Sequence, residues 1–208
     1  MWCFGFLKAL QQENIMKKII LGSASPRRKA LMEQMGAEFE VKASFGEEIY
    51  KSTVPEEIVK ELATMKAQNV AADLNAQNII VIGADTVVAL DGSVLGKPKD
   101  EADAFGMLKS LQGREHEVFT GVSLLDFSET GACKPHVCAV GTKVFVHNMD
   151  DSEILAYIQS GEPMDKAGAY GIQGKFAAYI DRIEGDYYNV MGLPISRLYQ
   201  LLKEIGQM

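Results

Sequence analysis

The stretch IIVIGADTVVAL, from Ile79 to Leu90, is a near-continuous apolar run that is rich in β-branched residues. Such a run is typical of a strand that is buried on both faces of a sheet. Asp91 and Gly92 follow it and predict a hairpin turn into a short strand at Val94 and Leu95. The run therefore predicts a central strand with an antiparallel neighbour.

Strand and helix patterns alternate along the rest of the chain. Apolar and β-branched runs predict strands at 19–21, 118–127, 137–146 and 177–183, and a glycine-rich stretch predicts a loop at 161–174. Helical spacing and capping residues predict helices at 26–35, 55–74, 100–113 and 152–159, and a last helix from Pro194. This order predicts a mixed α/β fold with parallel and antiparallel strands and flanking helices.

The composition excludes several classes of function. A chain of 208 residues, 47% hydrophobic and 24% charged, is typical of a globular protein with one large domain or two small lobes. A formal net charge of −7 argues against non-specific binding to nucleic acid, which depends on many basic residues. The cysteines, Cys3, Cys133 and Cys138, lack the spacing of a zinc site and are predicted to be reduced, as suits the cytoplasm.

The first fifteen residues are apolar but contain Lys8, lack a signal-cleavage pattern and are too short to cross a bilayer. Met16 and the two lysines after it look like a second start that leads directly into the first strand. We predict that residues 1–15 are a non-essential extension and that the protein has no membrane partner.

The helix expected at 26–35 begins with a pattern that predicts an anion site. Ser25 is placed as the N-cap and Pro26 as the first helical residue, and an ordinary helix start explains both. It does not explain Arg27 and Arg28, because the positive end of the helix dipole favours acidic residues in the first turn. Backbone N–H groups, serine hydroxyls and two guanidinium groups together suit a phosphate.

Asp85 interrupts the apolar strand, and an ionised carboxylate is costly to bury there without a partner. Ligands of open α/β sheets gather at the carboxyl ends of strands, where such a carboxylate can bind a metal or act as a base. The alternative is a bulge at which Asp85 faces water. The predicted hairpin brings Lys97 back roughly level with Asp85 and Thr86, although a single lysine is usually solvated on the surface.

Three other features support the same reading more weakly. Glu47 and Glu48 are paired carboxylates that suit Mg²⁺ beside Asp85, although a solvated loop is the better explanation of the pair taken alone. Lys66 borders the apolar face of its helix, although taken alone it is better explained as a surface lysine whose stem packs on that face while its charge stays in water. The stretch DKAGAYGIQG, 165–174, combines glycines with polar groups, and the Gln173 amide can read a base edge.

Five motifs together resemble the Maf family of nucleotide pyrophosphatases. They are SASPRRKALMEQMG, GADTVV, VLGKPKD, DKAGAYGIQG and GDYYNVMGLP, in the family's order and spacing from about Met16 to the C-terminus. The resemblance implies one domain over 16–208, elongated and two-lobed like the inosine triphosphate pyrophosphatases, with a cleft between the lobes. It implies hydrolysis of a nucleoside triphosphate to the monophosphate and pyrophosphate with a divalent cation, Mg²⁺ or Mn²⁺.

The resemblance also assigns roles to residues. Asp85 matches the catalytic carboxylate, taken as the general base, and Glu47 matches an acidic position near the metal that Asp85 would share. The matches to phosphate-holding positions are Ser23, Arg28 and the catalytic lysines Lys66 and Lys97, and Ser25 joins them as the helix cap.

Within the family, one branch prefers dTTP and UTP and another prefers 7-methyl-GTP. Arg27, Thr86 and Gln173 resemble the first branch, so the resemblance implies pyrimidine nucleotides. The alternatives are a 7-methyl-GTP pyrophosphatase, a non-enzymatic regulator of septum formation and a nucleotide sensor without turnover. A homodimer is the assembly that the resemblance suggests.

Overall fold

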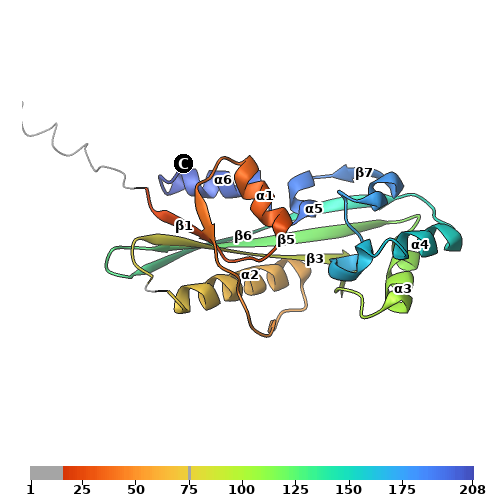
Figure 1. Cartoon of the computed structure of the whole chain (residues 1–208), viewed down its shortest axis with the longest axis horizontal. Helices are drawn as coiled ribbons and strands as arrows, with labels where there is room; N and C mark the ends of the chain where they lie inside the picture. Colours follow the sequence, from red (N-terminus) through yellow and green to blue (C-terminus); the bar gives the residue numbers. More distant parts are fainter. Residues whose placement is uncertain (1–15, 75) are drawn as a thin grey trace, which may run out of the picture.

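The computed structural model describes residues 16–74 and 76–208. The predicted extension at 1–15 lies outside the described residues. None of the helices within the described ranges is both long enough and apolar enough to pass through a membrane. The molecule is elongated along the direction of its longest strands (Figure 1).

A single mixed sheet runs through the described residues. Its strands are β1 (Lys18–Leu21), β2 (Phe39–Val41), β3 (Ile79–Leu90), β4 (Ser93–Leu95), β5 (Glu115–Phe127), β6 (Cys133–Val146) and β7 (Ile180–Glu184). The strand order is β2-β1-β3-β5-β6-β7, and β4 pairs with β3 beside this path. β1 runs parallel to β2 and β3, whereas all other pairs are antiparallel. The prediction of a mixed sheet is therefore confirmed.

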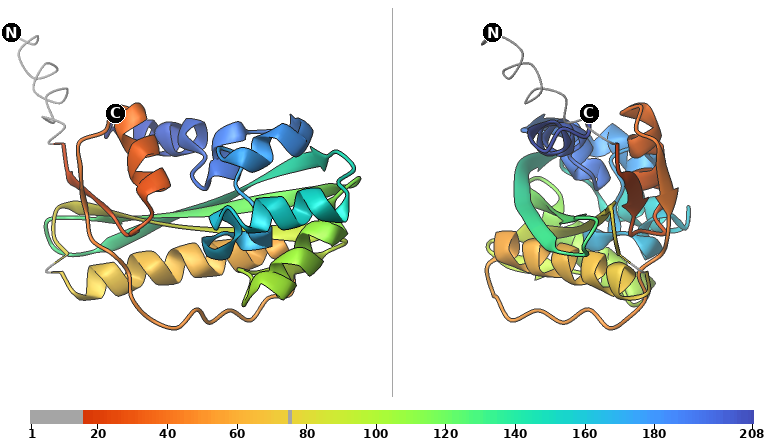
Figure 2. Two further views of the ribbon diagram at one scale, coloured as in Figure 1. Left: turned by 45° about the vertical axis from the view of Figure 1, so that its right-hand side comes forward. Right: turned by 90° about the vertical axis from the view of Figure 1, so that its left-hand side faces the viewer.

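Helices cover the sheet and its ends. They are α1 (Pro26–Gln34), α2 (Pro55–Ala72), α3 (Glu101–Leu111), α4 (Asp151–Ile158), α5 (Tyr187–Met191) and α6 (Ile195–Glu204). α2 lies along one face of the long strands, and α1, α5 and α6 lie along the other, while α3 and α4 gather at one end (Figures 1 and 2).

The alternation of side chains along β3 assigns its two faces. Ile80, Ile82 and Ala84 pack in a cluster with residues of α1 and α6. Val81 packs instead with Ala67 of α2. By the same alternation, the side chain of Asp85 lies on the face covered by α2, and that of Thr86 lies on the face covered by α1. These neighbouring residues are therefore on opposite faces of the sheet.

Two core clusters fill opposite ends of the molecule and share its long strands. One contains Ile82 of β3 and Leu124 of β5, packed with α1 and α6. The other contains Val88 and Val118 of the same strands, packed with α3 and α4. The middle of β3 between these clusters is where Asp85 and Thr86 stand.

The structure corrects some of the expected elements. Residues 175–179 form the short 3-10 helix η3 (Lys175–Tyr179), so the strand expected at 177–183 begins only at Ile180. Phe176 of η3 is fully buried among Tyr157, Tyr170 and Tyr179, and this packing replaces strand pairing there. The expected loop at 161–174 contains the 3-10 helices η1 (Glu162–Asp165) and η2 (Ala167–Ala169). β2 and α5 were not predicted, because three and five residues are too few to show a period.

Candidate functional site

A cleft of about 840 Å³ opens at the middle of β3 and is bordered by α1, α2, the segment at 44–50 and the segment at 165–174. Its lining includes five basic side chains, Arg27, Arg28, Lys66, Lys97 and Lys166. Three acidic side chains, Glu48, Asp85 and Asp165, accompany them. The cleft is thus locally positive in a chain whose formal net charge is −7, which favours an anionic ligand.

The start of α1 has the cap that the sequence predicted. Ser25 Oγ accepts a hydrogen bond from the backbone N of Arg28 at 3.4 Å, and Pro26 is in the first turn. The first turn contains no acidic residue, so the helix end keeps its positive character. Ser23, which is buried, and Ser25 both line the cleft at this point.

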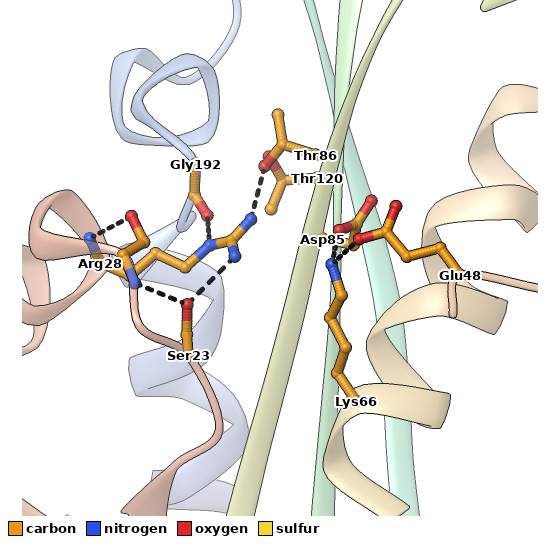
Figure 3. Close-up of polar contacts among 9 residues, drawn as sticks. Ser23, Arg28, Glu48, Lys66, Asp85, Thr86, Thr120 and Gly192 are labelled. Carbon is orange, nitrogen blue, oxygen red and sulfur yellow. Dashed lines mark hydrogen bonds and ion pairs between the residues drawn. The ribbon is translucent and has the colours of Figure 1, made fainter. Parts of the chain in front are cut away.

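Arg28 is held by three different partners across the cleft wall (Figure 3). Its Nε donates to Gly192 O at 2.8 Å, Nη1 to Ser23 Oγ at 3.2 Å, and Nη2 to Thr86 Oγ1 at 3.2 Å. Desolvation lowers the pKa of Arg28 from its ordinary value, and the charge of Asp85 opposes that shift. The guanidinium stays charged because that ordinary value is so high.

Asp85 lies on the other side of β3 with Lys66 and Glu48 (Figure 3). Asp85 is 7% exposed, and Lys66 Nζ forms an ion pair with its Oδ1. The same Nζ contacts Glu48 Oε1 at 2.7 Å. The buried carboxylate therefore has the partner that its burial demands, and one ammonium serves two carboxylates.

The neighbouring cations favour the ionised form of Glu48. Partial burial of Glu48 raises its pKa and is the largest single effect, whereas the hydrogen bond and the charge of Lys66 both lower it. With smaller contributions from Lys97 and Arg28, the pKa of Glu48 is lowered below its ordinary value. Glu48 is therefore a carboxylate, not a carboxylic acid, at neutral pH.

Most of the predicted site residues meet in this cleft. Asp85, Thr86, Lys66 and Lys97 line it, as do Ser23, Ser25, Arg27, Arg28 and Gln173. The register of the β3–β4 hairpin pairs Val88 with Leu95, which carries the chain back so that Lys97 reaches the cleft. Arg27 approaches Asp165 at 3.7 Å, so the first helical turn and the segment at 165–174 are linked across the opening.

Glu47 differs from the other predicted site residues. Among the described residues that line the cleft its neighbour Glu48 appears and Glu47 does not. The sequence offered both carboxylates, but the path of the irregular segment before α2 decides which one turns inward. The metal-binding role predicted for Glu47 is untested, and the lining of the cleft favours Glu48 for that role. Asn189 and Gly192, which lie behind Arg28, belong to the motif GDYYNVMGLP, but no role was predicted for either of them. Thr120 lies in none of the motifs and carried no signal that distinguished it from a core residue.

The donor set can accommodate a divalent cation. Mg²⁺ binds proteins through one or two carboxylates and completes its shell with water and substrate phosphates. Glu48 and Asp85 provide two carboxylates that already share one cation, the ammonium of Lys66. No group of three or more His, Cys, Asp and Glu side chains suited to a metal occurs within 16–74 and 76–208. These residues therefore fit an ion that depends on substrate for its other ligands.

Known proteins resemble this chain over nearly its whole length. A dTTP/UTP pyrophosphatase of Agathobacter rectalis is 49% identical over 202 residues, covering 92% of this chain and 98% of that protein. A dTTP/UTP pyrophosphatase of Dictyoglomus thermophilum is 50% identical over 192 residues, covering 91% and 97%.

The fold also has a counterpart among solved structures. A HAM1 protein from Coxiella burnetii superposes with a TM-score of 0.50 at 15% identity, covering 91% of this chain and 100% of that one. This likeness concerns the fold alone and confirms the prediction of a fold like that of the inosine triphosphate pyrophosphatases. The family described as Maf-like protein matches residues 18–205. With that match, and relatives about half identical over more than nine-tenths of its length, the chain belongs to the Maf-like protein family.

Proposed function

We propose that this protein hydrolyses dTTP and UTP to the nucleoside monophosphate and pyrophosphate. The observation that carries the proposal is the buried Asp85 carboxylate, paired with Lys66, in a cleft lined mostly by cations. Relatives about half identical to the chain carry the name dTTP/UTP pyrophosphatase, which supports the choice of substrate.

The reaction needs an oriented water and a stabilised leaving group. Water forms a bond to the α-phosphorus, the bond from that phosphorus to the bridging oxygen breaks, and pyrophosphate leaves with that oxygen. Asp85 accepts the proton that the water gives up. Arg28 and the α1 start bind phosphate oxygens, and Lys66 and Lys97 offset the charge that develops on the leaving pyrophosphate.

Binding of the triphosphate changes the partners of Lys66. In the structure its ammonium is occupied by Asp85 and Glu48. Phosphate oxygens attract the ammonium, and Asp85 is then available to take a proton. A divalent cation, Mg²⁺ or Mn²⁺, would be held by Asp85 and Glu48 and would neutralise phosphate charge when bound.

Thr86, Gln173 and Arg27 are proposed to select the pyrimidine nucleotide. All three line the cleft, and Gln173 is exposed at its opening. The 7-methyl-GTP activity and the non-enzymatic alternatives are tested by the same assay, which offers a panel of nucleoside triphosphates with Mg²⁺ or Mn²⁺. A homodimer remains a prediction from the resemblance, and size-exclusion chromatography with light scattering tests it.

The central test is Asp85→Asn, which keeps the size of the side chain but removes the base. We expect pyrophosphate release from dTTP to fall by about 10²-fold or more, because general-base catalysis contributes about 10²–10⁴-fold. The exposed Asp181, which pairs with Arg182 on β7, provides the matched control Asp181→Asn. Turnover by Asp85→Asn at the rate of that control, with both variants folded by circular dichroism, would contradict the role of Asp85.

A further inference from the structure

A chain of buried hydroxyl groups lies behind the guanidinium of Arg28. Thr86 of β3 is directly opposite Thr120 of β5 in the sheet register. Their Oγ1 atoms are 2.9 Å apart, and Thr120 Oγ1 donates to the backbone oxygen of Asn189 at 2.8 Å. Thr120 and Asn189 are both fully buried, so no water competes for these bonds.

The chemistry of the groups fixes the direction of every bond in this chain. A threonine hydroxyl has one hydrogen, and a carbonyl oxygen can only accept. Since Thr120 donates its only hydroxyl hydrogen to Asn189 O, Thr86 must be the donor in the hydrogen bond between the two threonines. Thr86 Oγ1 then presents a lone pair to Arg28, whose guanidinium can only donate. All the bonds therefore run one way, from Arg28 toward Asn189.

We call this chain of hydrogen bonds, from Arg28 through Thr86 and Thr120 to Asn189 O, the relay. The residue at its end, Asn189, is itself fixed in place. Asn189 Nδ2 donates to Val118 O and to Thr142 Oγ1, both at 2.9 Å. These contacts attach α5 to β5 and β6. A little further along the chain, Gly192 O accepts directly from Arg28 Nε. The turn that contains α5 thus contacts Arg28 in two ways: Gly192 O accepts from it directly, and Asn189 O is connected to it through Thr120 and Thr86.

These hydrogen bonds leave two N–H groups of the Arg28 guanidinium for a ligand. Three of the five guanidinium N–H groups are used by Gly192, Ser23 and Thr86. One N–H on each terminal nitrogen remains, and Arg28 lines the cleft. Two adjacent N–H groups match two oxygens of one phosphate, provided that the guanidinium does not rotate.

We propose that Thr120 is a positioning residue that sets the orientation of Arg28 and so the affinity of the cleft for a polyphosphate chain. Thr120 does not touch the ligand, and it acts through Thr86. The inference rests on the proposed function, in that Arg28 is taken to bind phosphate, and it adds a role for the motif GDYYNVMGLP, which contains both carbonyl groups.

The test replaces Thr120 by Val, which has nearly the same shape but no hydroxyl, and by Ser, which keeps it. The probe is inorganic tripolyphosphate, and its affinity is measured by isothermal titration calorimetry. We expect Thr120→Val to bind about tenfold more weakly, because Thr86 is no longer held in place as an acceptor for Arg28, and Thr120→Ser to stay within about twofold. Ser123→Ala is the matched control, since it removes another fully buried hydroxyl of β5 that has no partner among the described residues.

Steady-state kinetics with dTTP give a second readout. Asp85 and Lys66 are on the opposite face of β3, so Thr120→Val should raise KM while kcat stays within about threefold. A purely structural role of Thr120 would lower the amount of folded enzyme but would not separate KM from kcat.

Several outcomes would overturn the proposal. They are full affinity in a folded Thr120→Val, an equal loss in Thr120→Ser, and an equal loss in Ser123→Ala. If Thr120→Val does not fold, Thr86→Val breaks the same relay at the cleft, and full affinity in that variant overturns it. A wild-type protein that binds tripolyphosphate but releases no pyrophosphate from any nucleotide refutes the proposed function instead, and the relay is still judged by affinity.

Discussion

Two neighbouring glutamates in the sequence have different surroundings in the structure. Glu48 contacts Lys66 beside Asp85, and Glu47 does not line the cleft. The residue pattern GEE cannot distinguish them, because the segment at 42–54 is irregular and its side chains follow no period. What the sequence could predict was that a carboxylate next to Asp85 would suit a cation. Which carboxylate it is depends on the course of the chain before α2.

This difference makes a prediction for metal dependence. We expect Glu48→Gln to raise the Mg²⁺ concentration needed for half-maximal pyrophosphate release by about tenfold or more, because one carboxylate ligand is lost. Glu47→Gln, the matched control, should leave that concentration within about twofold of the wild type. The measurement is a Mg²⁺ titration at saturating dTTP. Equal shifts in the two variants, or a shift in Glu47→Gln alone, would contradict the assignment.

At the scale of elements, the sheet can approach α2 closely because β3 and β5 have glycines there. A Cβ atom built on Gly83 would lie 2.1 Å from Ala63 O, and one on Gly121 would lie 2.1 Å from Val59 O. Both distances are far inside van der Waals contact. The close approach also sets the reach of Lys66, which extends from α2 to Asp85 on β3.

Gly83→Ala should therefore damage both the packing and the site. We expect a loss of roughly 1–3 kcal/mol or more in the free energy of unfolding, because α2 must move away from the sheet. We also expect kcat to fall, since Lys66 moves with the helix. Gly106→Ala in α3 is the control: its Cβ would meet nothing within 4 Å, and a helix gains roughly 0.5–1 kcal/mol from the change. Urea unfolding measures the stability of both variants, and pyrophosphate release from dTTP measures kcat. A Gly83→Ala variant with the stability and activity of the wild type would refute the close packing.

How far the sequence predicts an element depends on whether the signal for it is local. The bounds of β3, the Ser25 cap of α1 and the Asp100 cap of α3 are local features, and the structure confirms them. The prediction that Lys97 returns to the cleft also succeeds, because a tight hairpin fixes the register on its own. The strand expected over 177–179 fails because the packing of Phe176, which is a tertiary effect, decides that segment.

The relay behind Arg28 is harder to predict from the sequence than any single element, because its members are far apart along the chain. Thr86 and Thr120 are 34 positions apart, and Thr120 and Asn189 are 69 apart. A threonine inside a strand is ordinary in any sheet, so nothing in the pattern marks Thr120 as part of a site. Most of the site residues predicted from the sequence line the cleft, whereas the place of Thr120 behind Thr86 became visible only through the strand register.

At the scale of the whole molecule, a buried histidine links a long strand to the segment that borders the cleft. His116 of β5 is 3% exposed, and its Nε2 is 2.7 Å from the hydroxyl of Tyr170. Burial lowers the pKa of His116 to about 4, so the folded protein keeps the ring neutral. In the unfolded chain the same ring takes up a proton near pH 6.5.

Stability should therefore fall as the pH is lowered from about 6.5 to about 4, where the unfolded chain binds a proton that the folded protein does not. The contribution of His116 is on the order of 3 kcal/mol over this range. We expect His116→Gln to lose less stability over this range than the wild type, and His147→Gln, an exposed control, to follow the wild type. Urea unfolding at a series of pH values measures this, and parallel curves for wild type and His116→Gln would contradict it.

The sharing of β3 and β5 by both core clusters restricts how the cleft can admit a ligand. Ten residues of β3, from Ile80 to Ala89, are paired without a break to β5, and Asp85 and Thr86 are in the middle of this ladder. A hinge at that place would have to tear the ladder, so the two ends of the molecule cannot swing apart as separate bodies. The floor of the cleft is thus one continuous sheet, bordered by the segment at 44–50 on one side and by the segment at 165–174, which the buried Tyr170 anchors to the core, on the other.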